Sequence, residues 1–172
     1  LLSTLVALIA SYLVYRTNCP LKKTIDTLSQ LPAAVPGTLF GLAFTLASTK
    51  VGYHNSAVLI VIAIAVGFMP FSYRILSSAF SQIKPSIDEG ARSLGASRVK
   101  VLYAVLVPIV GNGISNSIIY DFIRGVGTMS AVIFLVSFGT PLASIKILNL
   151  AEQGFWGDAA VLALLLTLIT FA

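Results

Sequence analysis

Charged residues are scarce in this sequence of 172 residues, because 57% of the chain is hydrophobic and only 10% is charged. Soluble domains carry about a quarter charged residues, so this composition excludes an ordinary soluble protein and indicates a membrane protein. The net charge is +5. The basic residues lie between apolar segments rather than in one patch, so we attribute them to membrane orientation and predict no nucleic-acid partner.

Residue types that carry site chemistry are also scarce. The only cysteine, Cys19, excludes an internal disulfide and has no second thiol with which to form a metal site. The only histidine, His54, has no second histidine or acid near it, which favours a polar loop residue over a metal ligand. Neither the phosphate-loop pattern GxxxxGK[ST] nor the zinc pattern HExxH occurs. We therefore predict no catalytic residue, no metal site and no cofactor, and expect another chain to supply any ATP site.

Apolar segments set the predicted fold. A bilayer core of roughly 30 Å requires about 20 helical residues. Four segments approach this requirement, and a fifth begins near Asp158 and continues to the last residue. The four segments are residues 1–15, 31–49, 56–76 and 101–120. The run 126–138 is short for a span, so we expect a re-entrant piece or the continuation of a kinked helix. The predicted fold class is an all-α, polytopic transmembrane helix bundle of about five spanning segments.

The basic residues predict how these segments are oriented. Eight of the eleven Lys and Arg fall into two connections. They are Arg16, Lys22 and Lys23 after the first segment, and Arg74, Lys84, Arg92, Arg98 and Lys100 between the third and fourth. Loops rich in Lys and Arg stay on the cytoplasmic side. We therefore predict that both connections are cytoplasmic and that residues 137–157 lie outside.

The second basic connection predicts a helix, a glycine break and another helix. Ser86 and Glu89 have the S-x-x-E spacing of a capping box, which places a helix start there. Gly95 supplies the left-handed conformation that ends a helix, and Ser97 can cap the next helix. The first of these helices has only about two turns, and such a helix is not stable alone because nucleation is costly. It must therefore contact something else.

Two readings of this short helix stay open from its residues alone. Ile87, Ala91 and Leu94 recur at helical spacing and form one narrow apolar face. That face either packs on the cytoplasmic end of the bundle or is presented to a cytoplasmic partner. In the second case the small residues Gly90 and Ala91 allow the partner's surface to come close, and Glu89 offers a charge that the partner can bind.

The loop resembles the signature of a known family. The pattern consists of Glu89, Gly90, Ala91, Gly95, Val105, Val107 and Pro108. It is similar to the cytoplasmic loop of the membrane subunits of type I ABC importers, the binding-protein-dependent permeases. Gly90 stands where alanine is more usual and Val107 where leucine is more usual, but the acid, the glycine and the proline are kept. The resemblance covers nearly the whole chain.

This resemblance implies partners and a location. The partners are a cytoplasmic ABC ATPase dimer, a periplasmic or extracellular solute-binding protein, a second permease domain and membrane lipid. The location is the bacterial cytoplasmic (inner) membrane, as a multi-pass protein. Because the chain starts and stops within apolar segments, we expect residues 1–172 to be a single transmembrane domain of a longer, two-half permease. The second domain is then either a fused half or another copy.

The resemblance also implies a role for the loop residues. The loop is a coupling helix that docks in a groove of the ATPase subunit, so that closure of the ATPase dimer reaches the bundle. Glu89, Ala91 and Gly95 correspond to the docking core, beside Gly90, and Pro108 closes the pattern. Arg92, like Arg98 and Lys100, flanks this core and contacts either the ATPase or lipid headgroups.

The second segment contains candidate gating residues. Pro36 removes a backbone hydrogen bond and predicts a kink, and Gly37 and Gly41 have the spacing that lets another helix approach closely. We favour helix packing over a hinge for this pair. The arrangement of leucine, proline and glycine here, and the run 127–166, are similar to ferric iron permeases, with thiamine and phosphonate permeases nearby. Ferric iron is therefore the expected solute.

The fourth segment contains candidate path residues. Asn112 and Asn116 suit a helix that borders an aqueous path, although they suit interhelical hydrogen bonds equally well. Asp121 and Arg124 are three residues apart, which brings them together on a helix. A mutually neutralising structural pair is favoured over a role in lining the path, because isolated charges at membrane depth are costly.

The expected function is that of a permease, not an enzyme, which moves a small solute inward by alternating access driven by ATP hydrolysis on partner subunits. The alternative is a secondary transporter driven by an ion gradient, with Asp121 and Arg124 as its coupling site. Inverted internal repeats would favour that alternative, and none is evident. A membrane-embedded enzyme would need clustered His, Cys or carboxylate residues, which the sequence lacks.

Overall fold

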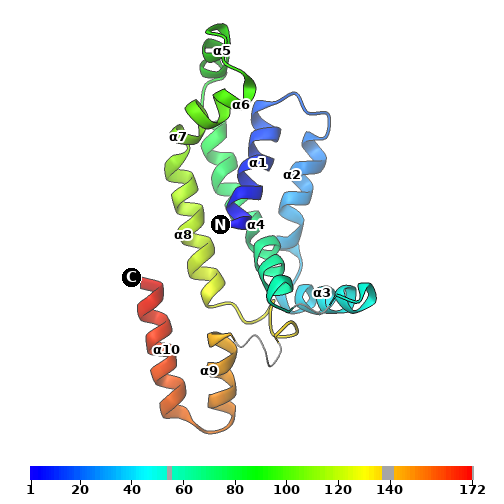
Figure 1. Ribbon diagram of the computed structural model, residues 1–172, viewed down its shortest axis with the longest axis vertical. Coiled ribbons are helices and arrows are strands. Elements are labelled where there is room, and N and C mark those ends of the chain that lie inside the picture. The colour runs from blue at the N-terminus through cyan, green and yellow to red at the C-terminus, as the bar shows by residue number, and fades with distance from the viewer. Residues whose placement is uncertain (54–55, 137–141, 172) are drawn as a thin grey trace. The chain divides into compact units, whose positions relative to one another are not determined.

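The computed structural model describes residues 1–53, 56–136 and 142–171, and every regular element in these ranges is helical (Figure 1). The prediction of an all-α fold is confirmed. His54 lies outside the described residues. The chain divides into two compact units. Unit 1 comprises Leu1–Leu31 and Met69–Tyr120, and unit 2 comprises Pro32–Phe68 and Asp121–Ala172.

Unit 1 is built around the C-terminal half of α4 (Ser56–Ser81). The helix α1 (Leu2–Arg16) packs on it through small residues, since Ala7, Ala10 and Ser11 are all buried. The Ser11 hydroxyl lies 3.2 Å from the Ser77 hydroxyl on α4. Such a bond inside an apolar bundle satisfies two polar groups that water cannot reach.

A second polar contact joins α2 (Lys22–Gln30) to the same helix. The hydroxyl of Tyr73, which is buried on α4, donates a hydrogen bond to the Asp26 carboxylate at 2.7 Å. The Gln30 side-chain amide also donates to this carboxylate, at 3.1 Å. The bond from Tyr73 joins α2 to α4, and the bond from Gln30, on α2 itself, holds the Asp26 side chain in place.

The rest of unit 1 runs from the end of α4 into α8 (Gly111–Val126) through several short helices. They are α5 (Pro85–Ser93), α6 (Arg98–Val101), the π-helical turn η2 (Leu102–Leu106) and α7 (Val107–Ile109). The stretch Arg98–Ile109 and α8 are bent by 72° at Val110. Pro108 contributes to this irregularity because it has no N–H to donate and its ring crowds the preceding turn. The single segment predicted for residues 101–120 is thus a bent pair of helices.

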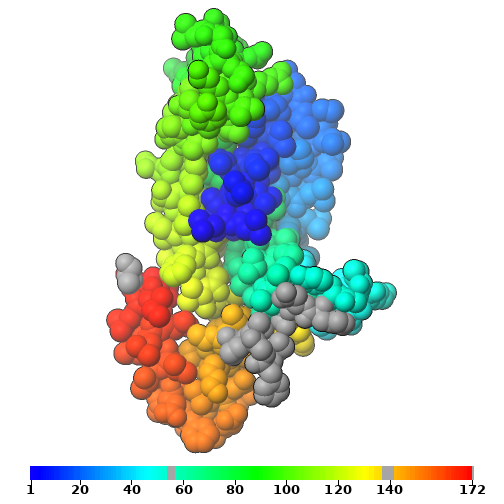
Figure 2. Space-filling model, viewed as in Figure 1, coloured from blue at the N-terminus to red at the C-terminus, as the bar shows by residue number. Residues whose placement is uncertain are grey.

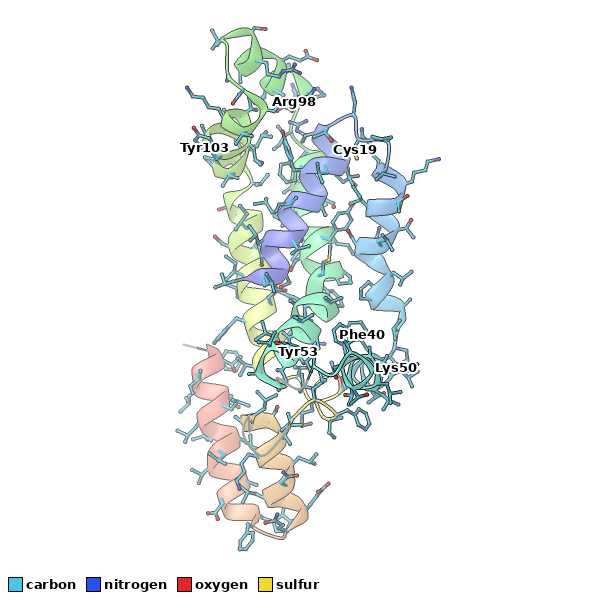
Figure 3. All side chains as sticks on the ribbon, turned by 45° about the vertical axis from the view of Figure 1, so that its right-hand side comes forward. Cys19, Phe40, Lys50, Tyr53, Arg98 and Tyr103 are labelled. Carbon is cyan, nitrogen blue, oxygen red and sulfur yellow. The ribbon has the colours of Figure 1, made fainter. Side chains whose placement is uncertain are left out.

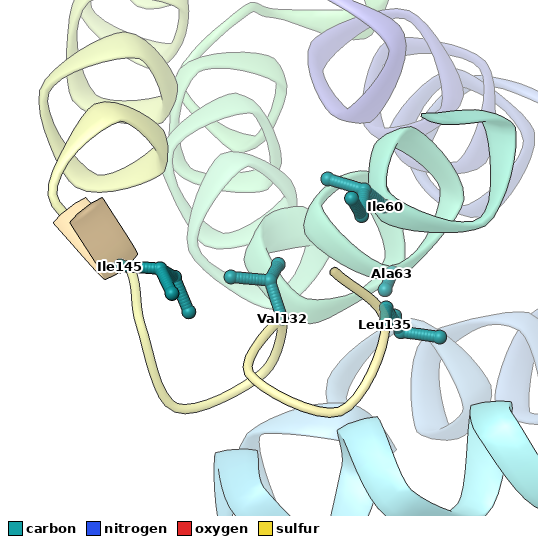
Figure 4. Packing of buried hydrophobic residues seen from close by; sticks show 5 residues of the cluster. All are labelled: Ile60, Ala63, Val132, Leu135 and Ile145. Carbon is teal, nitrogen blue, oxygen red and sulfur yellow. The ribbon is translucent and has the colours of Figure 1, made fainter. Parts of the chain in front are cut away.

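Unit 2 contains α3 (Gly37–Val51), the N-terminal half of α4, α9 (Ala143–Glu152) and α10 (Trp156–Phe171). Its core consists of Ile60, Ala63, Val132, Leu135 and Ile145 (Figure 4). Val132 and Leu135 belong to a run of turns that begins after α8 ends. The kinked-helix alternative for the run 126–138 is therefore wrong over its described residues. The chain forms turns there instead, and the turns carry core side chains.

Two glycines let α3 approach these turns closely. A Cβ atom at Gly41 would overlap the backbone carbonyl of Ala131, and one at Gly37 would lie 2.6 Å from the Ser130 hydroxyl oxygen. The Thr45 hydroxyl, one turn after Gly41, donates a hydrogen bond to the Phe134 carbonyl at 3.1 Å. The prediction of close packing at this glycine pair is confirmed, although its neighbour is a turn rather than a helix.

Several predicted boundaries need correction. The segment predicted for residues 31–49 is interrupted, because η1 (Leu31–Ala34) precedes α3 and Pro36 is the N-cap of α3 rather than an interior kink. Arg74 lies inside α4 rather than in the following connection, because α4 continues to Ser81. The region 137–157 contains α9, which was not predicted, and its external position stays a prediction.

The number of membrane spans remains a prediction. Within the described ranges, α4 alone is long and apolar enough to cross a membrane as one continuous helix, over Ala57–Ser81. Two bent pairs would each qualify if the pair is counted as a single span, and they are Lys22–Ala34 with Gly37–Val51 and Arg98–Ile109 with Gly111–Val126. The helices α1 and α10 are apolar but shorter.

Candidate functional site

The candidate site is the exposed loop from Lys84 to Val101 at one end of unit 1 (Figure 1). Its first helix, α5, begins at Pro85 with Lys84 as its N-cap, and that cap makes no side-chain hydrogen bond. The predicted capping box of Ser86 and Glu89 is therefore wrong. Proline has a backbone angle suited to the first helical position and lacks the N–H that a cap would satisfy, so the helix starts one residue before Ser86.

The end of α5 is as the sequence predicts. Gly95 has a φ of 84°, in the left-handed region. Its N–H donates to the Arg92 carbonyl at 2.9 Å, and the N–H of Ala96 donates to the Ala91 carbonyl at 3.2 Å. This pair of bonds is the Schellman motif, which closes a helix where glycine tolerates the left-handed turn.

The helix that follows is capped as predicted. Ser97 is the N-cap of α6, and its hydroxyl accepts a hydrogen bond from the Lys100 N–H at 3.3 Å. The end of α5 and the start of α6 are both fixed, and only Leu94, Gly95, Ala96 and the cap Ser97 lie between the two helices. The loop is therefore a rigid hairpin of two short helices.

The apolar face of α5 is divided between the bundle and the solvent. Ala91 is half-buried and packs against a cluster that includes Phe80 and Val101. Leu94 is 91% exposed, and Ile87 is also exposed. Packing on the bundle thus accounts for Ala91 and for part of Ile87, which lines a groove beside Ile83, whereas Leu94 stays almost fully exposed.

The outer surface of α5 carries the acid of the predicted signature. Glu89 and Gly90 are both exposed, and a Cβ atom added at Gly90 would meet nothing within 4 Å. The loop atoms form the protruding end of unit 1 in the space-filling view (Figure 2). A shallow hollow of about 560 Å³ on this surface is lined by Glu89, Arg92, Ser93, Gly95, Ala96 and Ser97. This surface combines a charge, an exposed leucine and room for close approach.

Arg16, at the end of α1, holds the base of α5, and sequence reasoning missed this role. Its guanidinium donates hydrogen bonds to the carbonyls of Ile83, at 3.1 Å, and Lys84, at 3.5 Å. The Arg16 Nε atom also lies 3.2 Å from an oxygen of Asp88. The Arg16 side chain is only 4% exposed. From the sequence, Arg16 was interpreted only as one of the basic residues that orient the membrane segments. No local sequence pattern indicates that it pairs with Asp88.

A second loop contact comes from the same helix. The Tyr12 hydroxyl, one turn before Arg16, donates a hydrogen bond to the Arg98 carbonyl at 3.4 Å. Arg98 and Cys19 lie at the same end of unit 1 (Figure 3). A polar pocket of about 90 Å³ lies between α1 and the loop, lined by Tyr12, Arg16, Thr17, Asn18, Asp88, Arg92, Arg98 and Val101.

An open groove between α4 and α8 contains two of the predicted path residues. Asn112 and Asn116 are exposed and line it, together with Ser78 from α4 and Gln82 just after that helix. The groove has a volume of about 480 Å³ and also includes apolar side chains. Gly113 brings the two helices together, since a Cβ atom there would lie 3.3 Å from the Ala79 Cβ. The two asparagines therefore line an open groove in unit 1.

Of the other candidate residues, Pro108 lies in unit 1 and the remaining four lie in unit 2. Pro36 and Gly37 are at the start of α3, where Gly37 is packed against Ser130. Asp121 is 7% exposed, whereas Arg124 is exposed. Pairing between Asp121 and Arg124 remains a prediction. Pro108 is exposed at the bend that precedes α8. No group of three or more His, Cys, Asp or Glu side chains that could hold a metal ion occurs within the described ranges.

Similarity to known proteins agrees with these features. The chain is 30% identical to a ferric transport system permease protein of Actinobacillus pleuropneumoniae over 173 residues, which cover 99% of this chain and 25% of that protein. It is 28% identical to a putative ferric transport system permease protein of Haemophilus influenzae, covering 81% of this chain and 22% of that protein. The chain thus spans about a quarter of the length of these two relatives.

More distant relatives have other names. A sulfate transport system permease protein of Salmonella typhimurium is 23% identical over 92% of this chain and 63% of its own length.

The sequence model of the family described as "Binding-protein-dependent transport system inner membrane component" matches residues 3–172. The family resemblance stated from the sequence is therefore confirmed, and this chain belongs to the family of binding-protein-dependent transport system inner membrane components.

Proposed function

We propose that this chain is the transmembrane domain of an ATP-driven ABC importer permease, which moves a small solute into the cytoplasm by alternating access. Family membership over residues 3–172 supports the class of transporter. The chain itself carries no ATPase site in this proposal. Hydrolysis takes place on a separate cytoplasmic ATPase dimer, and a solute-binding protein delivers the solute from the other side.

The observation that carries the proposal is the exposed surface of α5. A helix of nine residues does not persist alone, yet this one is closed by a Schellman motif and held at its base by Arg16. Its outer surface presents Glu89, the open position of Gly90 and the nearly fully exposed Leu94. A structured helix with an exposed apolar residue beside a charge suits insertion into a groove of a partner. We propose that this partner is the ATPase.

The orientation and the remaining partners follow from this assignment. The α5 loop and the end of α1 are cytoplasmic, with Arg92, Arg98 and Lys100 exposed where they contact the ATPase or lipid headgroups. A second permease domain, fused or separate, completes the path. We place Asn112 and Asn116 on that path because both line the open groove between α4 and α8.

Ferric iron is the proposed solute. The two ferric relatives match at 30% and 28% identity, whereas a sulfate relative and a molybdate/tungstate relative match at 23% and 24%. In this proposal the binding protein recognises iron, and the permease domain only conducts it.

Copurification of the full-length permease with its ATPase tests the role of α5. We expect Glu89→Arg to lose the ATPase, because it places a positive charge at the centre of the docking surface. Glu152→Arg makes the same charge change at an exposed position on α9 and should keep the ATPase. Both variants should accumulate in the membrane like the wild type. Equal recovery of the ATPase with both variants would contradict the docking role of α5.

A further inference from the structure

The last turn of α1 holds the α5–α6 hairpin at two points. Arg16 donates to the Ile83 and Lys84 carbonyls, which lie in the connection between α4 and α5, and it pairs with Asp88 in the first turn of α5. Tyr12 donates to the Arg98 carbonyl at the start of α6. All these residues belong to unit 1. One helix end therefore contacts the hairpin both before and after its glycine break.

The Arg16 contact differs from an ordinary surface ion pair. The Arg16 side chain is 4% exposed and that of Asp88 is 21% exposed, so neither charge is fully solvated. Removal of one partner of such a pair leaves an uncompensated buried charge. The planar guanidinium also reaches two carbonyls and a carboxylate at once, which the single ammonium of lysine does not reproduce.

The helix α5 has few other apolar attachments to unit 1. Ala91 is its half-buried apolar residue, and one methyl group gives little packing area, whereas α6 is anchored in the core cluster by the buried Val101. The helix α1, in contrast, is firmly attached to α4, because Ala7, Ala10 and Ser11 are buried and Ser11 bonds to Ser77. The α1 contact is therefore the main connection between α5 and the core of unit 1 besides the chain itself.

We infer that Arg16 is a positioning residue that fixes α5 to α1, so that any displacement of α5 moves α1 together with it. The inference rests on the proposed function for its consequence, because the displacement comes from the docked ATPase. When Arg16 is replaced, α5 stays docked on the ATPase but pivots about the end of α4. The displacement of α5 is then not passed to α1. The variant is then uncoupled while still bound to its ATPase.

Distance measurements between two spin labels test the attachment without the ATPase. Cys19 is partly exposed just after α1, and Leu94→Cys places the second label on α5. The full-length permease is used, with any cysteine outside residues 1–172 replaced by serine. We expect a narrow distance distribution with Arg16 present and a clearly broader one with Arg16→Gln. Asp88→Asn should also broaden the distance distribution. If Arg16→Gln does not fold, Asp88→Asn is used in its place.

A control label pair separates loss of attachment from general loosening. Cys19 with Ser78→Cys reports the distance from the end of α1 to α4, which bypasses the hairpin. This distribution should stay narrow in Arg16→Gln. If both pairs broaden, Arg16 holds unit 1 together as a whole, and the inference is wrong. If neither pair broadens, α5 is held by other contacts, and the inference is wrong as well.

A functional measurement completes the test. Arg16→Gln should copurify with the ATPase as the wild type does, because Arg16 is buried away from the outer surface of α5, while ATP-dependent solute uptake falls several-fold. Arg16→Lys should not restore uptake, since it keeps the charge but not the planar fork. Wild-type uptake in Arg16→Gln overturns the inference even where Glu89→Arg releases the ATPase. If Glu89→Arg keeps the ATPase instead, the proposed function fails, and the label distances still decide the attachment.

Discussion

Gly41→Ala is expected to lower the free energy of unfolding of the permease by about 1–3 kcal/mol, the usual cost of overpacking. A Cβ atom at this position overlaps the Ala131 carbonyl, and a backbone carbonyl cannot rotate away as a side chain can. Either α3 or the turns near Ala131 must shift, and these turns carry Val132 and Leu135 of the unit 2 core. The midpoint of thermal unfolding of the purified full-length protein measures the effect.

Gly67→Ala is the matched control for this prediction. Gly67 lies inside α4 in the same unit, and a Cβ atom there would meet nothing within 4 Å. Alanine favours a helix over glycine by about 1 kcal/mol, so this variant should be neutral or slightly more stable. Gly37→Ala should cost less than Gly41→Ala, because its nearest neighbour is the rotatable Ser130 hydroxyl. Equal stability of Gly41→Ala and Gly67→Ala would show that α3 does not approach the turns closely.

Gly95→Leu is expected to abolish most solute uptake while the permease still accumulates in the membrane. A leucine in the left-handed region costs roughly 1–2 kcal/mol, and a helix as short as α5 cannot absorb that strain. The Schellman bonds of Gly95 and Ala96 would be lost, so α5 would no longer be presented in a fixed direction. Uptake by membrane vesicles, normalised to the amount of permease, measures this effect.

Gly90→Ala serves as the control for Gly95→Leu. It changes a glycine of the same helix, but it adds one methyl group in open space at a position with ordinary helical backbone angles. Alanine is also the more usual residue of the resembling family at this position. Uptake should therefore stay near that of the wild type. Uptake in Gly95→Leu equal to that in Gly90→Ala would show that the fixed end of α5 does not matter for transport.

Local signals in the sequence predicted part of the candidate site. The left-handed glycine at Gly95 and the cap at Ser97 were predicted correctly, because both depend only on neighbouring backbone groups. The start of α5 was predicted wrongly because two start signals compete. Pro85 at the first helical position prevails over the capping box of Ser86 and Glu89.

Contacts between distant residues were not predictable in the same way. Arg16 and Asp88 are 72 positions apart by residue number, and nothing near either residue distinguishes this pair from other charges of the two basic connections. The break at Pro36 was predicted only as a kink within one segment. An apolar run such as residues 31–49 satisfies a length criterion whether or not it contains the start of a separate helix, for which Pro36 is the N-cap.

Helix α9 was not predicted from the sequence. Residues 137–157 were predicted to lie outside from the order of the apolar segments and the two basic connections, and no helix was named within them. Within them, Ile145 and Leu148 recur three residues apart, and Ile145 reaches the unit 2 core. A search for helical spacing in short amphipathic stretches would have found this helix.

The most direct test of the whole account is solute uptake by proteoliposomes that contain the full-length permease with its ATPase subunit. The probe is radioactive ferric iron loaded on the solute-binding protein. We predict uptake that requires ATP hydrolysis, persists when ion gradients are collapsed, and is lost in Glu89→Arg. Uptake that continues without ATP and follows an imposed ion gradient would contradict the account and would favour a secondary transporter.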